Sequence, residues 1–278
     1  MPPLFDIENL RCSYEHPFIS GTSKVVLEIK RLEIPRGTMV FIVGESGIGK
    51  STVLEALGMM NRTMVPDPEA KACFIDKDGS RTDLVALWKD EDRLTEFRLK
   101  HFSFIFQNTN LMRNFTAFEN VAITRLLQGY SREETMGKVK QLLSELGLGS
   151  VSESDSPQDL SGGQQQRLAF ARATLPDFSV LFGDEPTGNL DSGNAFRAMA
   201  LLEHQLERHE GRSSVIVTHD MPLAVRYAGM IVKMRRKNGI GYVDETCVFR
   251  PDRERETWSN GRLTFQPREF EMFLHQKG

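Results

Sequence analysis

Four residues at fixed spacing are suited to binding phosphate. Gly44, Gly49, Lys50 and Ser51 match the pattern G-x-x-x-x-G-K-[ST]. The glycines let the backbone curl so that its N–H groups point at an anion. Lys50 would then reach the β and γ phosphates of a nucleotide, and the Ser51 hydroxyl would coordinate magnesium. A plain glycine-rich turn explains the glycines but not the Lys-Ser pair, so the pattern predicts a nucleotide site.

Paired carboxylates form a second chemical element far along the chain. Asp184 and Glu185 follow the apolar residues 180–182, which places both acids at the carboxyl end of a buried strand, where open α/β sheets bind ligands. Asp184 would complete the magnesium shell, and Glu185 would polarise a water for attack on the γ phosphate. Alone, such a pair is usually a polar exit from the core. The phosphate loop in the same chain favours the catalytic interpretation.

Alternating strands and helices must position these groups. Thr116 with Glu119 and Ser131 with Glu134 have the spacing of capping boxes and mark two helix starts. The alternation predicts a parallel sheet with helices on its faces. From the hydrophobic pattern we expect strands at residues 4–10, 25–29, 39–43, 72–75, 101–107, 179–182 and 213–217, and helices near residues 50–58, 116–146, 162–172 and 192–208.

The composition is that of an ordinary globular chain. Its 278 residues carry 35 Lys and Arg against 38 Asp and Glu, so no overall basic field is available to hold nucleic acid. Cys12, Cys73 and Cys247 are far apart and lack metal-binding spacing, which favours reduced thiols in a cytosolic protein. The chain start does not resemble a signal peptide. The apolar runs are much shorter than the roughly 20 residues of a membrane-spanning helix.

The segment LSGGQQQR at residues 160–167 completes a set of motifs that resembles the nucleotide-binding subunit of ATP-binding cassette (ABC) transporters. The resemblance covers roughly residues 4–243 and implies ATP hydrolysis with Mg²⁺. It implies Glu185, His219 and Gln107 as catalytic residues and Ser51, Gln107 and Asp184 as metal ligands. The implied ATP contacts are Tyr14, which would stack on adenine, and the loop residues Gly44, Glu45, Ser46, Gly47, Ile48, Gly49, Lys50, Ser51 and Thr52.

Three of these assignments also have a structural alternative. His219 and Gln107 each stand at the end of a predicted strand, where a polar side chain needs no function, and Tyr14 is a single aromatic near the chain start. Their order along the chain favours the family roles: a γ-phosphate contact for His219, a sensor of magnesium and attacking water for Gln107, and base stacking for Tyr14.

The signature residues Ser161, Gly162, Gly163 and Gln164 precede or begin a predicted helix, where N–H groups form a second anion site. One chain cannot easily wrap two anion sites around the same phosphate. The resemblance implies a head-to-tail homodimer, in which the signature of one subunit closes over the ATP held by the other, with Asp191 in the D-loop. Hydrolysis would remove this charged link and open the dimer.

The resemblance implies an α/β P-loop ABC cassette with a central, mostly parallel sheet, an antiparallel β subdomain and a helical subdomain. We expect the ATPase domain over residues 1–243, the helical signature subdomain at about 108–172, and a C-terminal extension at 244–278. Asn-Gly steps at 238–239 and 260–261 predict hairpin turns. The second turn, in the extension, fits either edge packing or a docking surface.

The phrases FIFQNTNLMRNFTAFENV and DEPTGNLD resemble the branch that contains the ATPases LolD, MacB and FtsE. This implies a cytoplasmic subunit, peripheral on the inner face of the cell membrane, that powers separate permease subunits resembling FtsX, LolC or the MacB membrane region. The work would be export, extraction of lipid or lipoprotein, or mechanotransmission. One alternative is an FtsE-like regulatory ATPase that controls cell-wall hydrolases. Another is a soluble ABC ATPase acting on nucleic acid, although no nucleic acid partner is expected.

Overall fold

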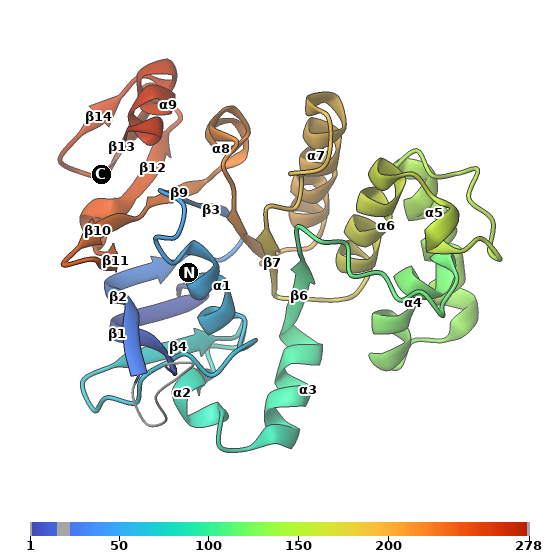
Figure 1. The fold of residues 1–278 in the computed structure, drawn as a ribbon, viewed down its shortest axis with the longest axis horizontal. Helices are drawn as coiled ribbons and strands as arrows, with labels where there is room; N and C mark the ends of the chain where they lie inside the picture. Colours follow the sequence, from blue (N-terminus) through green and yellow to red (C-terminus); the bar gives the residue numbers. More distant parts are fainter. Residues whose placement is uncertain (1, 16–22, 277–278) are drawn as a thin grey trace. The chain divides into compact units, whose positions relative to one another are not determined.

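The computed structural model describes residues 2–15 and 23–276. The chain divides into two compact units (Figure 1): unit 1 comprises Met1–Leu94 and Val215–Gly278, and unit 2 comprises Thr95–Ser214. The chain leaves unit 1 within helix α3 (Glu91–His101) and returns to it within strand β8 (Ser213–Val217). The phosphate loop therefore belongs to unit 1 and the signature to unit 2.

A six-stranded, mainly antiparallel sheet forms one part of unit 1. Its strand order is β10-β11-β2-β1-β4-β5, and only β11 and β2 pair in parallel. Leu27 and Ile29 of β2 are buried with more accessible residues between them, as in a half-buried strand. The strands are β1 (Phe5–Glu15), β2 (Ser23–Ile34), β4 (Lys71–Ile75), β5 (Arg81–Asp83), β10 (Arg235–Lys237) and β11 (Ile240–Val243).

Five further strands of unit 1 are neighbours in the order β14-β13-β12-β9-β3. β3 (Met39–Val43) and β9 (Met230–Lys233) pair in parallel and are buried along their whole length, as expected for strands covered on both faces. The other strands pair antiparallel: β12 (Val248–Asp252), β13 (Thr257–Ser259) and β14 (Thr264–Phe265).

The helices of unit 1 are short. α8 and α9 pack against each other, and α9 also packs on β13 and β14. Beyond the start of α3, unit 1 contains the helices α1 (Lys50–Leu57), α2 (Leu84–Leu87), α8 (Met221–Tyr227) and α9 (Pro267–His275) and the 3₁₀ turn η2 (Glu245–Cys247).

Unit 2 combines a parallel strand pair with a helical bundle. β6 (Phe102–Ile105) and β7 (Val180–Asp184) pair in parallel. The rings of Phe102 and Phe182 meet edge to face, with their centroids 5.2 Å apart. α4, α5 and α6 pack against one another, and α7 packs on α6. The helical elements are α4 (Ala117–Leu127), α5 (Arg132–Glu145), η1 (Pro157–Asp159), α6 (Gly162–Thr174) and α7 (Ser192–Arg208).

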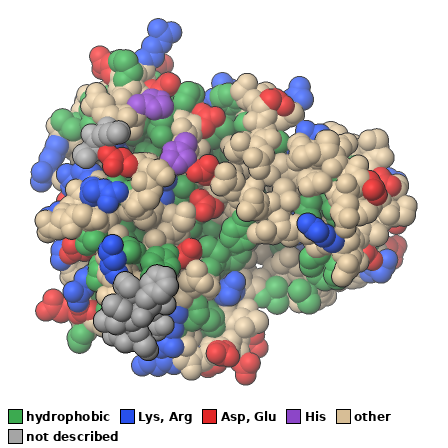
Figure 2. All heavy atoms as spheres, viewed as in Figure 1, with side chains coloured by type: hydrophobic (Ala, Val, Ile, Leu, Met, Phe, Trp, Pro, Cys, Tyr) green, Lys and Arg blue, Asp and Glu red, His purple; other side chains and the backbone are tan. Residues whose placement is uncertain are grey.

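The surface carries both signs of charge, as expected from the similar numbers of acidic and basic residues. Figure 2 shows acidic and basic side chains interspersed over one face of the described residues. The three cysteines are free, and burial raises the pKa of Cys12 to about 12. Among the residues that the structure describes, no helix is both long enough and apolar enough to cross a bilayer.

The local predictions hold best where sequence signals are strong. Strands 39–43 and 213–217 and helix 192–208 have the predicted bounds, and the capping box at Thr116 is present. In residues 61–92 only the strand at 72–75 was predicted. β5, α2 and the start of α3 were missed because they are short or, like α3, mostly polar.

Asn120 of α4 organises the turn of unit 2 that leads into this helix. It is fully buried. Its Oδ1 accepts the Met112 N–H at 2.8 Å, and its Nδ2 donates to the carbonyls of Met112, Phe115 and Thr116 at 2.9–3.2 Å. One amide side chain therefore satisfies four backbone hydrogen-bonding groups of the turn that leads into α4.

We predict that Asn120→Asp lowers the free energy of unfolding by about 3 kcal/mol, because an oxygen would replace the donor that faces three carbonyls. Urea unfolding followed by circular dichroism measures the change. Asn61→Asp makes the same chemical change at an exposed position and should cost less than about 0.5 kcal/mol. Equal effects of the two substitutions would contradict the role of Asn120.

Candidate functional site

The phosphate loop lies between β3 and α1, as the pattern predicts. β3 ends at Val43, and Gly49 precedes α1 with φ of 99°, a left-handed conformation that strains residues with a Cβ. α1 begins at Lys50, so the N–H groups of its first turn have no partner one turn earlier in the helix. A helix start of this kind binds anions.

The Lys50 side chain spans the loop. It is buried, and its Nζ donates to the carbonyl of Gly44 at 3.0 Å and to that of Glu45 at 2.9 Å. A buried ammonium is stable only when polar groups surround it. The loop carbonyls provide such groups, and they keep a positive charge at the place where phosphates would bring negative charge.

β11 passes directly against the loop at Gly241. A Cβ at this position would lie 2.0 Å from the carbonyl oxygen of Ile48, so a larger residue would displace either the strand or the loop. Gly241 was not predicted from the sequence as a residue that supports the site. The available signal was a glycine inside a strand, which often marks a close approach of another backbone segment.

Tyr14 lies on β1 beside the start of α1. Its hydroxyl hydrogen-bonds to Thr52 Oγ1 at 3.1 Å and donates to the carboxylate of Glu55 at 2.5 Å. Burial, together with the Glu55 carboxylate, raises the pKa of Tyr14 to about 12. The ring is thus held next to the end of the phosphate loop and is partly exposed. The adenine role of Tyr14 stays a prediction.

His219 connects β8 to α8. The next residue, Asp220, caps α8 by accepting the Leu223 N–H at 2.9 Å, so the histidine stands at a fixed helix start. His219 lines a cavity of about 410 Å³ together with residues 44–46 of the phosphate loop. Unit 1 therefore brings His219, the predicted γ-phosphate contact, and the phosphate loop to one cavity.

The paired acids of unit 2 stand at the carboxyl end of β7. Asp184 is the last residue of the strand. Glu185 has φ of 48°, which is uncommon for a residue other than glycine, and its carbonyl accepts the Gly188 N–H at 3.0 Å. Strained conformations of this kind gather at functional sites, in agreement with the predicted catalytic position.

The signature forms a capped helix start. Ser161 Oγ accepts the Gln164 N–H at 3.3 Å, and Gln164 Oε1 accepts the Ser161 N–H at 2.8 Å. The box therefore occupies two of the N–H groups near the start of α6. Gly162 and Gly163, which follow the cap, supply the N–H groups that an incoming phosphate would meet.

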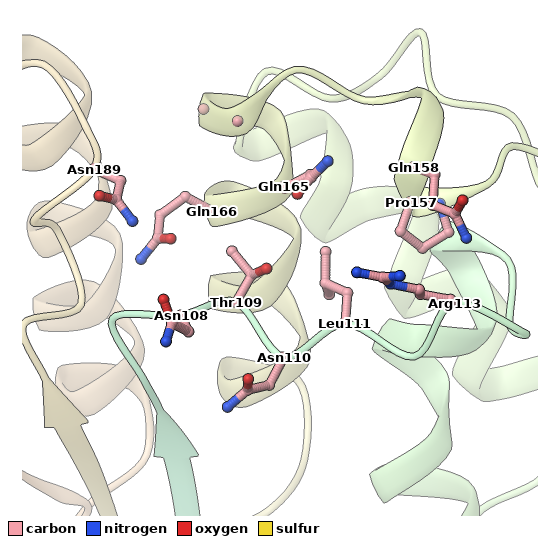
Figure 3. A pocket seen from close by; sticks show the side chains of 12 residues that line it. Asn108, Thr109, Asn110, Leu111, Arg113, Pro157, Gln158, Gln165, Gln166 and Asn189 are labelled. Atoms are coloured by element: carbon pink, nitrogen blue, oxygen red, sulfur yellow. The ribbon is translucent and has the colours of Figure 1, made fainter.

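The segment after Gln107 is fastened to the signature helix. Arg172 of α6 donates to the carbonyls of Thr109 and Asn110 at 2.7 and 2.8 Å, and Asn189 Nδ2 donates to the Gln107 carbonyl at 3.1 Å. These segments line a cavity of about 790 Å³, shown in Figure 3. Unit 2 thus brings the segment after Gln107, the start of α6 and Asn189, which is two residues before Asp191, to one cavity.

One further contact connects the motifs of unit 2, and a second one caps α7. Gln166 of α6 is buried, and its Nε2 donates to the Pro186 carbonyl at 2.7 Å, which links the signature helix to the turn after the paired acids. Asp191 caps α7 by accepting the backbone N–H of Asn194 at 2.9 Å, and this bond lowers the pKa of Asp191. The role of Gln166 was not predicted from the sequence, because its partner Pro186 lies outside the signature motif.

The donors predicted for magnesium have suitable chemistry. Ser51 lies in the first turn of α1 in unit 1, and Asp184 ends β7 in unit 2. Mg²⁺ is usually held by one or two protein oxygens, with phosphate and water oxygens completing its shell. In the described ranges, no cluster of three or more His, Cys, Asp or Glu residues forms an all-protein metal cage.

A family model described as ABC transporter matches residues 27–188, more than half of the chain. The chain belongs to the ABC transporter family. The macrolide export ATP-binding/permease protein MacB of Shewanella sp. (strain W3-18-1) is 40% identical over 227 residues, which is 81% of the cassette. MacB of Escherichia coli (strain K12) is 38% identical over 236 residues. The cassette covers only 32% and 34% of these relatives, so it spans about a third of their length.

Solved structures confirm the predicted cassette fold. The dimeric structure of the bacterial ABC transporter cassette MJ0796 has a TM-score of 0.71 and 32% identity, and the match covers 86% of this chain and 96% of that one. The same cassette in a post-hydrolysis state, bound to ADP and phosphate, has a TM-score of 0.71 and 30% identity. The branch predicted from the motif phrases is also confirmed, because its members include MacB.

We predict that Gly241→Ala weakens ATP binding about tenfold or more, because the added methyl group would push against Ile48 and distort the phosphate loop. Isothermal titration calorimetry with ATP measures the affinity. Gly137→Ala in α5 is the matched control, since its Cβ would enter open space, and it should leave ATP affinity unchanged. Unchanged affinity in the Gly241 variant would show that the loop does not depend on this contact.

Two substitutions of Tyr14 separate its ring from its hydroxyl. We expect Tyr14→Ala to weaken ATP binding about tenfold, as the loss of a base-stacking ring does. Tyr14→Phe loses only the bonds to Thr52 and Glu55 and should bind within about threefold of the parent. Competition with a fluorescent ATP analogue measures both. Equal losses in the two variants would assign the effect to the hydroxyl and rule out stacking.

Proposed function

We propose that this chain hydrolyses ATP as a homodimer and drives a separate membrane permease, in export, extraction of lipid or lipoprotein, or mechanotransmission. The observation that carries the proposal is the cavity of unit 1 that is lined by residues 44–46 of the phosphate loop and by His219. It brings an imidazole to the loop that holds the buried Lys50 ammonium. A simple nucleotide-binding turn does not need that pairing.

The residues have complementary tasks in this mechanism. Lys50 and the loop N–H groups neutralise phosphate charge, which is the main demand of phosphoryl transfer. Glu185 accepts a proton from the attacking water, and Gln107 orients that water. His219 donates a hydrogen bond to the γ phosphate. Ser51 and Asp184 would hold Mg²⁺, which would supply positive charge near the phosphates.

The homodimer supplies the remaining phosphate contacts. The signature of one subunit, Ser161 to Gln164, presents its helix start to the ATP held by the other, and Asp191 lies in the segment that faces the partner. The similarity to a cassette solved as a dimer supports this arrangement. The nucleotide anion then joins the two subunits, and its hydrolysis lets them separate.

The permease is expected to be a partner at the inner face of the membrane, resembling FtsX, LolC or the membrane region of MacB. The name of the relatives, ATP-binding/permease protein, supports this partner, since the chain spans about a third of their length. Among the proposed kinds of work, that name favours export. The cavity beside Gln107, lined by residues 108–111 and Arg113, is the proposed surface through which the partner is moved.

We predict that Glu185→Gln reduces ATP turnover at least about a hundredfold, because the amide cannot accept the proton of the attacking water. ATP should still bind and drive dimerisation. Phosphate release measures turnover, and size-exclusion chromatography with ATP measures the dimer. Glu203→Gln makes the same change on α7, away from the paired acids, and should hydrolyse ATP normally.

The same variant tests the partner. Because Glu185→Gln holds ATP without consuming it, the tagged protein should retain an integral membrane protein from detergent-solubilised native membranes in the presence of ATP. Turnover that is unchanged in the variant would remove Glu185 from the mechanism. Recovery of nucleic acid or cell-wall hydrolase components, without any permease, would overturn the transport function.

A further inference from the structure

The C-terminal helix α9 lies outside the residues matched by the family model and is nevertheless built into unit 1. Phe270 is fully buried and Leu274 nearly so. The ring of Phe270 stacks on Trp258 of β13 with centroids 5.0 Å apart, and it also meets Phe249 of β12 at 5.0 Å. These aromatic contacts fix α9 on the strands of the extension. The helix also packs on α8, which follows His219.

Lys233 fastens the last turn of α9 next to the phosphate loop. It ends β9 and pairs in register with Val43, the residue directly before the loop. Its buried Nζ donates to the Phe273 carbonyl at 2.6 Å and lies 3.8 Å from the centre of the Phe273 ring. A cation is favourable at a helix C-terminus, where carbonyls are unpaired. Burial lowers the pKa of Lys233.

The end of α9 reaches the ATP site through this contact. His275 and Gln276 line the same 410 Å³ cavity as residues 44–46 and His219, and Lys233 lines it too. The cavity therefore has three walls within unit 1: the start of the phosphate loop, the His219 turn, and the last turn of the C-terminal helix.

We propose that α9 is part of the ATP site and that Lys233 and His275 are positioning residues for the γ phosphate. Lys233 holds the last turn of α9 in place, and His275 limits the space into which His219 can turn, so that His219 faces the phosphate loop. This inference rests on the ATP hydrolysis proposed above and adds a role for the extension. The position of α9 depends in turn on which nucleotide occupies the cavity.

ATP and ADP should act differently on α9. Only ATP brings a γ phosphate to the side of the cavity that His219 and His275 line. A ligand shifts a conformation only by binding its two states with different affinity, and the γ phosphate is the group that can do so here. The position of α9 should therefore depend on the γ phosphate and not on the presence of a nucleotide as such.

Trp258 is a built-in reporter of α9. The chain has two tryptophans, so Trp88→Phe leaves Trp258 as the only one, stacked on Phe270. In that protein carrying Glu185→Gln, ATP should change the Trp258 emission and ADP should not. The change should stay the same over about a tenfold range of protein concentration, which separates it from dimerisation.

Substitutions then test the two positioning residues. With Glu185 intact, Lys233→Met and His275→Ala should each lower kcat about fivefold with KM for ATP within about twofold of the parent, since the phosphate loop supplies most of the ATP contacts and α9 acts mainly on the placement of His219. In the Trp258 reporter protein, both should abolish the ATP-dependent emission change while ATP still binds. Lys233→Arg keeps a cation and should restore most of kcat and of the signal. Met272→Ala, at an exposed position of α9 that does not line the cavity, is the control and should behave like the parent.

The outcomes separate this inference from the function on which it rests. An unchanged Trp258 emission on saturation with ATP, or parent-like kcat in both Lys233→Met and His275→Ala, would overturn the role of α9 and leave ATP hydrolysis standing. A lowered kcat that Lys233→Arg does not restore, together with an unfolded circular dichroism spectrum, would assign Lys233 to stability alone. Failure of the parent protein to bind ATP would overturn the proposed function itself.

Discussion

A buried positive charge beside a helix start is the constraint on which the rest of unit 1 depends. Lys50 is stable in the interior because loop carbonyls surround it. That geometry needs a curled glycine backbone between a rigid strand and a helix. β3 is rigid because it is buried along its length beside β9, and the close pass of Gly241 keeps the loop against β11. The apolar strands therefore hold the loop in the conformation that keeps the Lys50 charge in place.

Unit 2 meets a different requirement, which is to hold three separated motifs in a fixed relation. The signature helix α6 provides the connections: Arg172 holds the segment after Gln107, and Gln166 holds the turn after the paired acids. Asn189 returns to the Gln107 carbonyl. Because these bonds run to backbone carbonyls, a shift of α6 would move the other motifs with it, as a nucleotide-driven subunit requires.

Local sequence patterns predicted the structural features that depend on residues close together in the chain. The phosphate loop, β3, α7 and the capping box at Thr116 are determined by residues a few positions apart, and the sequence reveals them. Gly241, Gln166 and Asn120 were not predicted as site or support residues, since each acts on a segment outside its own motif. Their residue types alone do not show which backbone they meet.

The sequence by itself determined the family, the order of the motifs and the chemistry of each, because phosphate binding needs particular residue types at short spacing. It also showed that the chain extends beyond the motif-bearing region. Only the tertiary structure decided that the last turn of α9 lies beside the phosphate loop, where Lys233 holds the Phe273 carbonyl. The physical reason is that a hydrophobic pattern shows which face of α9 is buried but not the surface that buries it.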